Sequence, residues 1–135
     1  MMSLAIEKHQ LPSELSSMAR VEQLIDELKE KHKIPEEIYA NLLIATTEAV
    51  NNALKHGNKM DKSKMIDLHF EFSDAEFCIT VIDQGSGFDY ENVPDPTLPE
   101  NIEKPDGRGI FIMKNLSDEV SFEEEGRIVK LTFYK

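Results

Sequence analysis

The clearest hydrophobic pattern along the chain begins at Pro35 and continues to His56. Apolar residues recur there at every third or fourth position, which predicts a helix with one side buried against the rest of the protein. Proline suits the first turn of a helix, and Gly57 is expected just beyond the last turn, where glycine often ends helices. The apolar side of this predicted helix consists of Ile38, Leu42, Leu43, Ala45, Ala49, Val50, Ala53 and Leu54.

A polar stripe follows the opposite side of the same predicted helix. At about 100° per residue, Glu48, Asn52 and Lys55 fall in one column. A carboxylate, an amide and an ammonium group are what a magnesium-bound phosphate requires: a base, an oxygen ligand and a positive charge. A solvated helix face is the ordinary alternative. It accounts poorly for Asn51 beside Asn52 in a helix interior, where each Asn costs roughly 0.5 kcal/mol relative to Ala.

A second helical pattern lies nearer the N-terminus. The helix is predicted to begin at Pro12-Ser13, with Ser13 as its N-cap, and to end in the basic run 29–33, where positive charges suit the helix dipole. Residues 3–10 predict a short extended segment at a sheet edge. Arg20 lies off the apolar stripe and, by position alone, is a solvated surface residue. The stripe itself consists of Leu15, Met18, Val21, Leu24, Ile25 and Leu28.

The second half of the chain carries the strand patterns. Alternating apolar residues predict strands over 66–72 and 76–83, and the second is expected at the centre of the sheet because both of its faces are apolar. A short helix over 110–116 is followed by a hairpin of strands 120–123 and 128–133. Helices and strands are grouped rather than strictly alternated. This order predicts an α+β fold, a two-layer sandwich in which helices cover one face of a mostly antiparallel, mixed sheet.

Composition is that of an ordinary globular domain and narrows the functional classes. The 135 residues form one domain with room for a core, and 26 acidic against 15 basic residues give a formal net charge of -11. Such a surface repels phosphate backbones, so direct nucleic-acid binding is not expected. The sequence has no membrane-spanning apolar run and no leader pattern, and its single Cys78 is predicted to be a core residue. A cytoplasmic protein without membrane contact is the expectation.

Asp83 closes the predicted central strand and is followed by Gly85 and Gly87. A carboxylate in that place can accept a hydrogen bond from an exocyclic amine such as that of adenine. The two glycines lack side chains, so a flat ring could approach the backbone closely. An ordinary turn after a strand is the alternative explanation of this segment.

A long proline-containing loop over 90–106 separates this segment from Gly107, Arg108 and Gly109. A loop of that length in a compact domain is usually a lid or a disordered segment. The two glycines precede the predicted helix over 110–116, whose N-terminus offers backbone N–H groups to an anion. Arg108 could add charge-assisted contacts to phosphate, although a flexible hinge would also explain the glycines.

Together, these motifs and their order resemble the GHKL (Bergerat-fold) superfamily, which includes gyrase, histidine kinases and MutL. Residues 48–52 resemble its N box, 83–87 its first glycine box and 107–109 its second. Within the superfamily, the chain is most similar to the bacterial anti-sigma-factor serine kinases of the sporulation and general-stress type. The stretches that carry this closer similarity are 18–21, 48–53, 56–57, 107–110, 112–113 and 118–120.

The resemblance implies a Bergerat ATP-binding fold, a single histidine-kinase-like ATPase domain over 1–135, and an ATP lid at about 90–109. It implies Mg-ATP as the cofactor and a homodimer as the assembly. The implied activity is that of a protein serine/threonine kinase acting as an anti-sigma factor. Such a protein holds a sigma factor inactive and phosphorylates a serine on an antagonist protein.

The resemblance also assigns residue roles. Glu48 matches the general base, Asn52 the side-chain ligand of Mg²⁺, and Asp83 the acceptor of the adenine amine. Arg20 matches a position used for partner binding, and Asn51 departs from the family in standing where a small hydroxyl residue is common. The further expected nucleotide contacts are Lys55, Gly85, Gly87, Gly107, Arg108, Gly109 and Ile110.

Two other functions stay open from the residues. The first is an ATP-gated switch that sequesters a partner with little catalysis. The second is a stand-alone ATPase domain of a histidine kinase, but the sequence has no long helical hairpin to carry a phospho-accepting histidine, and its second glycine box is a single G-x-G.

Overall fold

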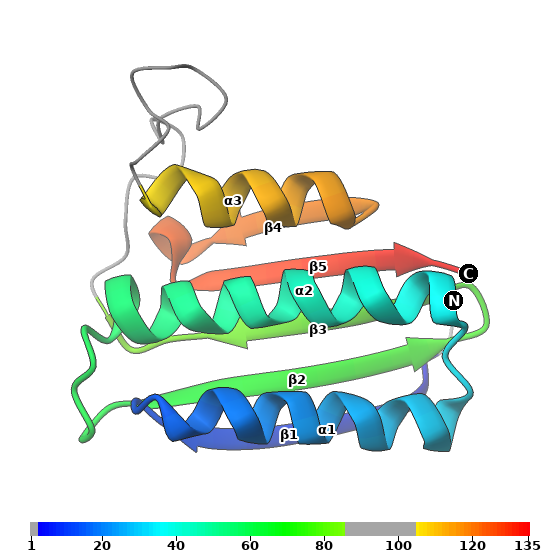
Figure 1. Ribbon diagram of the computed structural model, residues 1–135, viewed down its shortest axis with the longest axis horizontal. Helices are drawn as coiled ribbons and strands as arrows, with labels where there is room; N and C mark the ends of the chain where they lie inside the picture. The colour runs from blue at the N-terminus through cyan, green and yellow to red at the C-terminus, as the bar shows by residue number, and fades with distance from the viewer. Residues whose placement is uncertain (1–2, 86–104) are drawn as a thin grey trace.

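Three α-helices lie on one face of a five-stranded sheet in the computed structural model, which describes residues 3–85 and 105–135 (Figure 1). This arrangement confirms the predicted two-layer α+β sandwich. The order of elements along the chain also follows the sequence pattern, from an N-terminal strand through two helices to a C-terminal hairpin.

The strand order in the sheet is β1-β2-β3-β5-β4, with β3 at the centre and β1 at an edge as predicted. Every pairing between described strands is antiparallel, so the sheet is more regular than the mixed sheet expected. The β2–β3 register pairs Asp67 with Ile82, which places the residues before β2 beside those after β3. The strands are β1 (Ser3–Pro12), β2 (Met65–Ser73), β3 (Glu76–Ile82), β4 (Glu119–Glu123) and β5 (Ile128–Tyr134).

The core forms between the helices and the inner face of the sheet. The alternating apolar residues of β2 are all buried: Ile66, Leu68 and Phe70 are 0% exposed and Phe72 is 3% exposed. Cys78 is also buried, as predicted. No helix within the described residues is long and apolar enough to cross a membrane.

Helix α1 (Ser16–His32) begins later than predicted, and the assignment of Ser13 as its N-cap is wrong. The strand β1 continues to Pro12, and the Ser13 hydroxyl donates instead to the Lys64 carbonyl at 2.5 Å. Ser13 is fully buried. Its hydroxyl therefore ties the β1–α1 junction to the segment before β2 and does not cap the helix.

Helix α2 (Glu36–Asn52) continues into a π-helical turn, η1 (Ala53–Gly57). Gly57 was predicted just beyond the last turn, but it is the last residue of η1, and Asn58 is the C-cap. Gly57 also lacks the positive φ typical of a helix-ending glycine. Two residues after the turn, Lys59 and Met60, have a positive φ. Gly57 is required for another reason, which concerns the space beside Asp83.

Thr46, on the buried side of α2, has a hydroxyl that finds no hydrogen-bond partner among the described residues. Valine has nearly the same shape and no hydroxyl to desolvate. Thr46→Val is therefore expected to raise the free energy of unfolding by about 1 kcal/mol, measured by urea denaturation.

The neighbouring Thr47 provides the matched control. Its hydroxyl donates to the Ile44 carbonyl at 2.9 Å, so Thr47→Val removes a satisfied group and should bring no gain. A Thr46→Val protein less stable than the wild type would show that this hydroxyl has a partner in solution.

Candidate functional site

Glu48 and Asn52 lie one turn apart on α2 and both face Gly109 of α3 (Pro105–Leu116). A Cβ atom built on Gly109 would lie 3.0 Å from Asn52 Nδ2, 3.1 Å from Asn52 Oδ1 and 3.1 Å from Glu48 Oε2. Both polar side chains are half-buried. The carboxylate and the amide of the predicted stripe therefore converge on one point of the α3 backbone.

Helix α3 begins at Pro105, whereas the sequence pattern placed its start after Gly109. Proline is favoured at the first helical position, which accounts for the earlier start. Gly107 consequently lies in the first turn, where backbone N–H groups lack acceptors within the helix. Arg108 is exposed, and Ile110 is 3% exposed and belongs to the core.

Lys55 is exposed and lies in the π-helical turn. A π turn contains more residues than an α turn, so the spacing that aligned Lys55 with Glu48 and Asn52 ends at the last α-helical residue. Among the described contacts, none joins Lys55 to the Glu48–Asn52 pair.

Asp83, directly after β3, is 4% exposed and packs against two glycines. The Gly85 N–H donates to Asp83 Oδ1 at 2.8 Å. A Cβ atom on Gly57 would overlap the Asp83 carboxylate, and one on Gly85 would overlap the Gly57 carbonyl. Burial raises the pKa of Asp83 above its usual value, while the Gly85 hydrogen bond and the charges of Arg127 and Lys64 act to lower it.

Asn58 holds the segment after β3 through hydrogen bonds. The sequence analysis assigned it no functional role. Its side chain is 0% exposed and contacts the residues on both sides of it in space, Ser13, Met65 and Gln84. Its place in a polar stretch after a helix predicted only a turn. No sequence pattern distinguishes a buried, hydrogen-bonded Asn58 from an ordinary turn residue, because its partners Ser13 and Gln84 are distant in sequence.

The two clusters, Glu48–Asn52–Gly109 and Gly57–Asp83–Gly85, lie at one end of the molecule. Figure 1 shows the C-terminal end of α2, the end of β3 and the N-terminal end of α3 together at the left. One continuous helical segment, α2 with η1, contributes to both clusters. Gly87 and residues 90–104 of the predicted lid lie outside the described residues.

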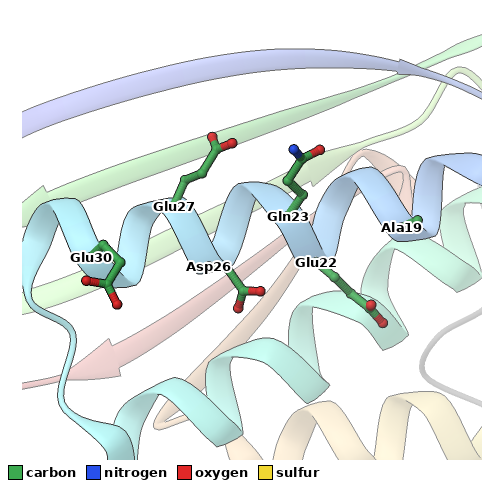
Figure 2. Close-up of a pocket in the computed structure, with 6 residues that line it drawn as sticks. All are labelled: Ala19, Glu22, Gln23, Asp26, Glu27 and Glu30. Atoms are coloured by element: carbon green, nitrogen blue, oxygen red, sulfur yellow. The ribbon is translucent and has the colours of Figure 1, made fainter.

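Arg20 lies on the exposed face of α1, apart from these contacts. Its Nη1 donates to Gln23 Oε1 at 2.9 Å and lies 3.9 Å from Glu27 Oε1. The adjoining hollow on α1 is mostly acidic, which would repel a triphosphate, so it is not part of a nucleotide site. Figure 2 shows its lining residues, Ala19, Glu22, Gln23, Asp26, Glu27 and Glu30.

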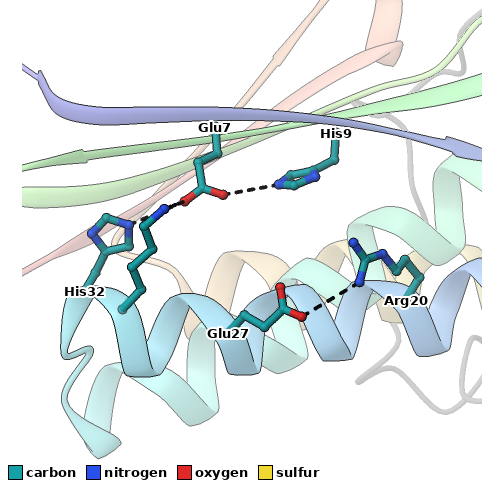
Figure 3. A network of polar contacts seen from close by, with 6 residues as sticks. Glu7, His9, Arg20, Glu27 and His32 are labelled. Carbon is teal, nitrogen blue, oxygen red and sulfur yellow. Dashed lines mark hydrogen bonds and ion pairs between the residues drawn. The ribbon is translucent and has the colours of Figure 1, made fainter.

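A further polar cluster ties β1 to the end of α1 (Figure 3). Glu7 accepts from Lys31 at 3.1 Å, and its carboxylate lies 3.4 Å from His9 Nε2 and 3.6 Å from His32 Nε2. Burial acts to raise the pKa of Glu7, but these hydrogen bonds and the Lys31 charge outweigh it and lower that pKa. His32 also stacks on Phe72, with the ring centroids 4.1 Å apart. We assign this cluster a structural role.

Comparison with known proteins gives three findings. Residues 11–133 match the family described as a histidine kinase-like ATPase domain. The chain is 35% identical over 99 residues to the serine-protein kinase RsbW of Staphylococcus aureus strains JH9 and Newman, an alignment that covers 67% of this chain and 62% of those relatives. The chain thus spans less than two thirds of their length.

The third finding is a structural similarity to the RsbU and RsbW domains of a Mycobacterium tuberculosis protein. The TM-score is 0.62 at 16% sequence identity, covering 96% of this chain and 32% of that chain. At that identity the similarity concerns the fold, which is the same α+β arrangement.

Proposed function

Because the chain belongs to the histidine kinase-like ATPase domain family, we propose that it is an ATP-dependent protein serine kinase that acts as an anti-sigma factor. It would sequester a sigma factor and phosphorylate a serine on an antagonist protein. The name of the Staphylococcus aureus relatives, serine-protein kinase, supports serine as the acceptor. The sigma factor and the antagonist are proposed as partners because the motif resemblance implies them.

One observation carries the proposal: Glu48 and Asn52 converge on the same backbone position of α3. A carboxylate can take the proton of a hydroxyl group, and an amide oxygen is a hard ligand suited to Mg²⁺. Gly109 has no side chain that would fill the space between them. The donor set therefore fits a magnesium-bound phosphate at this place.

When bound, Mg-ATP supplies the γ-phosphoryl group that is transferred. Glu48 would orient the serine hydroxyl and accept its proton, while Asn52 would hold Mg²⁺ through Oδ1. The N–H groups in the first turn of α3, including that of Gly107, would face the phosphates. The exposed cations Lys55 and Arg108 would add positive charge around them.

Asp83 would accept a hydrogen bond from the adenine amine, with Gly85 and Gly87 leaving room for the ring. The burial of Asp83 supports this role. A carboxylate shielded from water binds a ligand group that donates a hydrogen bond much better than one that only accepts, because an unpaired buried charge is costly. We further propose a lid over residues 90–109, a homodimer, a cytoplasmic location, and a partner contact through Arg20. The exposure of Arg20 beside the α1 hollow supports contact with a protein.

The test is transfer of γ-labelled phosphate from ATP to a purified candidate antagonist. Acid-stable label on a serine is expected. Partner binding without any label would favour the ATP-gated switch, and acid-labile phosphate would favour a histidine kinase domain. Either outcome would contradict the proposal.

Asn52→Ala is expected to weaken Mg-dependent ATP binding by roughly 10–100-fold, because a ligand of the metal is lost. Titration calorimetry with and without Mg²⁺ measures the effect. Asn51→Ala is the matched control, since it removes the same side chain from the adjacent, equally half-buried position. Unchanged Mg-dependent affinity in Asn52→Ala would remove Asn52 from the metal site.

A further inference from the structure

Asn58 is a fully buried amide that joins three segments of the chain. Its Oδ1 accepts the Gln84 backbone N–H at 2.7 Å. Its Nδ2 donates to the Met65 carbonyl at 3.0 Å and to Ser13 Oγ at 2.9 Å. The side chain is 0% exposed, so these partners replace water entirely.

The partners fix which way the amide of Asn58 points. The Gln84 N–H can only donate and the Met65 carbonyl can only accept, so Oδ1 must face the first and Nδ2 the second. One acceptor and two donors are thus required from a single short side chain. Asparagine supplies all of them, whereas aspartate keeps only the acceptor and alanine keeps none.

The atom held by Asn58 lies between the two residues assigned to the adenine base. Gln84 connects Asp83 to Gly85, and its own Oε1 accepts the Met65 N–H at 2.6 Å. Gly57, immediately before Asn58, contacts the Asp83 carboxylate and the Gly85 backbone. Gly57 therefore packs against Asp83, and Asn58 accepts a hydrogen bond from the next residue, Gln84. The two contacts together fix the position of the segment after β3.

We propose that Asn58 is a positioning residue for recognition of the adenine base. This inference rests on the proposed function. Asn58 acts through the Gln84 backbone: its hydrogen bond keeps Asp83 and Gly85 in register with each other, so the Asp83 carboxylate stays aimed at one place. Without this hydrogen bond, residues 83–85 are no longer held to the segment that follows η1, and discrimination between adenine and other bases falls.

The experiment is calorimetric titration of the full chain with ADP and with IDP, which carries an oxygen in place of the exocyclic amine of adenine. The ratio of the two Kd values reports base recognition, because the phosphates are the same. The wild type is expected to prefer ADP. In Asn58→Ala, ADP binding should weaken by about tenfold while IDP binding changes little, so the preference is lost.

Two further variants separate positioning from stability. Asn58→Asp keeps the acceptor for Gln84, and Ser13→Ala removes only one partner of Nδ2. Both lose buried hydrogen bonds and should unfold at lower temperature, yet both should keep the preference for ADP. Circular dichroism checks that each variant is folded.

The outcomes are distinguishable. If the wild type does not bind ADP, or does not prefer it to IDP, the proposed function and this inference both fail. If the wild type prefers ADP and folded Asn58→Ala keeps that preference, only the inference fails. If Asn58→Ala does not fold, Asn58→Leu, which has a similar size and also lacks the acceptor for Gln84, takes its place: loss of the ADP preference in the folded protein supports the inference, and retention contradicts it.

Discussion

Glu48→Gln is expected to slow phosphate transfer to serine by a factor of about 10²–10⁴, the usual contribution of a general base. Glutamine has nearly the same shape as glutamate but cannot accept the hydroxyl proton. ATP affinity should stay within about twofold, because the proposed role of Glu48 belongs to the transition state and not to nucleotide binding. Single-turnover kinetics with the antagonist, together with calorimetric ATP titration, measures both quantities.

Glu37→Gln is the matched control for this charge change. Glu37 lies in the first turn of the same helix and is exposed, so its loss removes one negative charge far from Gly109. Transfer by this variant should equal that of the wild type. Undiminished transfer in Glu48→Gln would remove Glu48 from the reaction and leave its convergence with Asn52 without a catalytic role.

Gly85→Ala is expected to lower ADP affinity by about tenfold or more and to destabilise the fold by about 1–3 kcal/mol. The added Cβ would overlap the Gly57 carbonyl, which is backbone and cannot rotate away. The segment after β3 must then shift, and Asp83 shifts with it. Calorimetry and urea denaturation give the two changes.

Gly109→Ala is a useful contrast. Its Cβ would meet the ends of two side chains at 3.0–3.1 Å, and these can move by a few tenths of an ångström. Alanine also favours a helix over glycine by about 1 kcal/mol, so this variant should fold at least as stably as the wild type. A Gly85→Ala protein with wild-type affinity and stability would show that the close contact with Gly57 relaxes without consequence.

The fold was predictable because its signals are local and periodic. The alternation in β2 and the helical stripe of α2 each determine one buried face, and a sheet covered by helices satisfies them all. The convergence of Glu48 and Asn52 was predictable for a similar reason, since the two residues lie one helical turn apart. The family match confirms the resemblance that the sequence motifs indicated.

Two of the errors concern contacts between segments distant in sequence. Serine is a favoured N-cap residue, but the Ser13 hydroxyl donates to the Lys64 carbonyl and accepts from Asn58, both distant in sequence. Gly57 was correctly singled out, but for its backbone conformation, whereas the structure requires it for the space that Asp83 occupies. Local propensity cannot reveal either partner.

The π-helical turn η1 was also beyond prediction, because no residue type marks it. It moves Lys55 off the regular column of Glu48 and Asn52. The roles of Lys55 and the other site residues stay predictions, to be tested by the substitutions above.

The continuity of α2 and η1 has an evolutionary consequence. Helix α2 and η1 form one hydrogen-bonded segment that contributes to both clusters. In the proposed site, this segment would carry the groups for the phosphates at one place and those for the base at another, and helix geometry, not loop length, would set the distance between them. In that site, neighbouring loops could gain, lose or exchange residues without changing the distance between the two ends of the nucleotide.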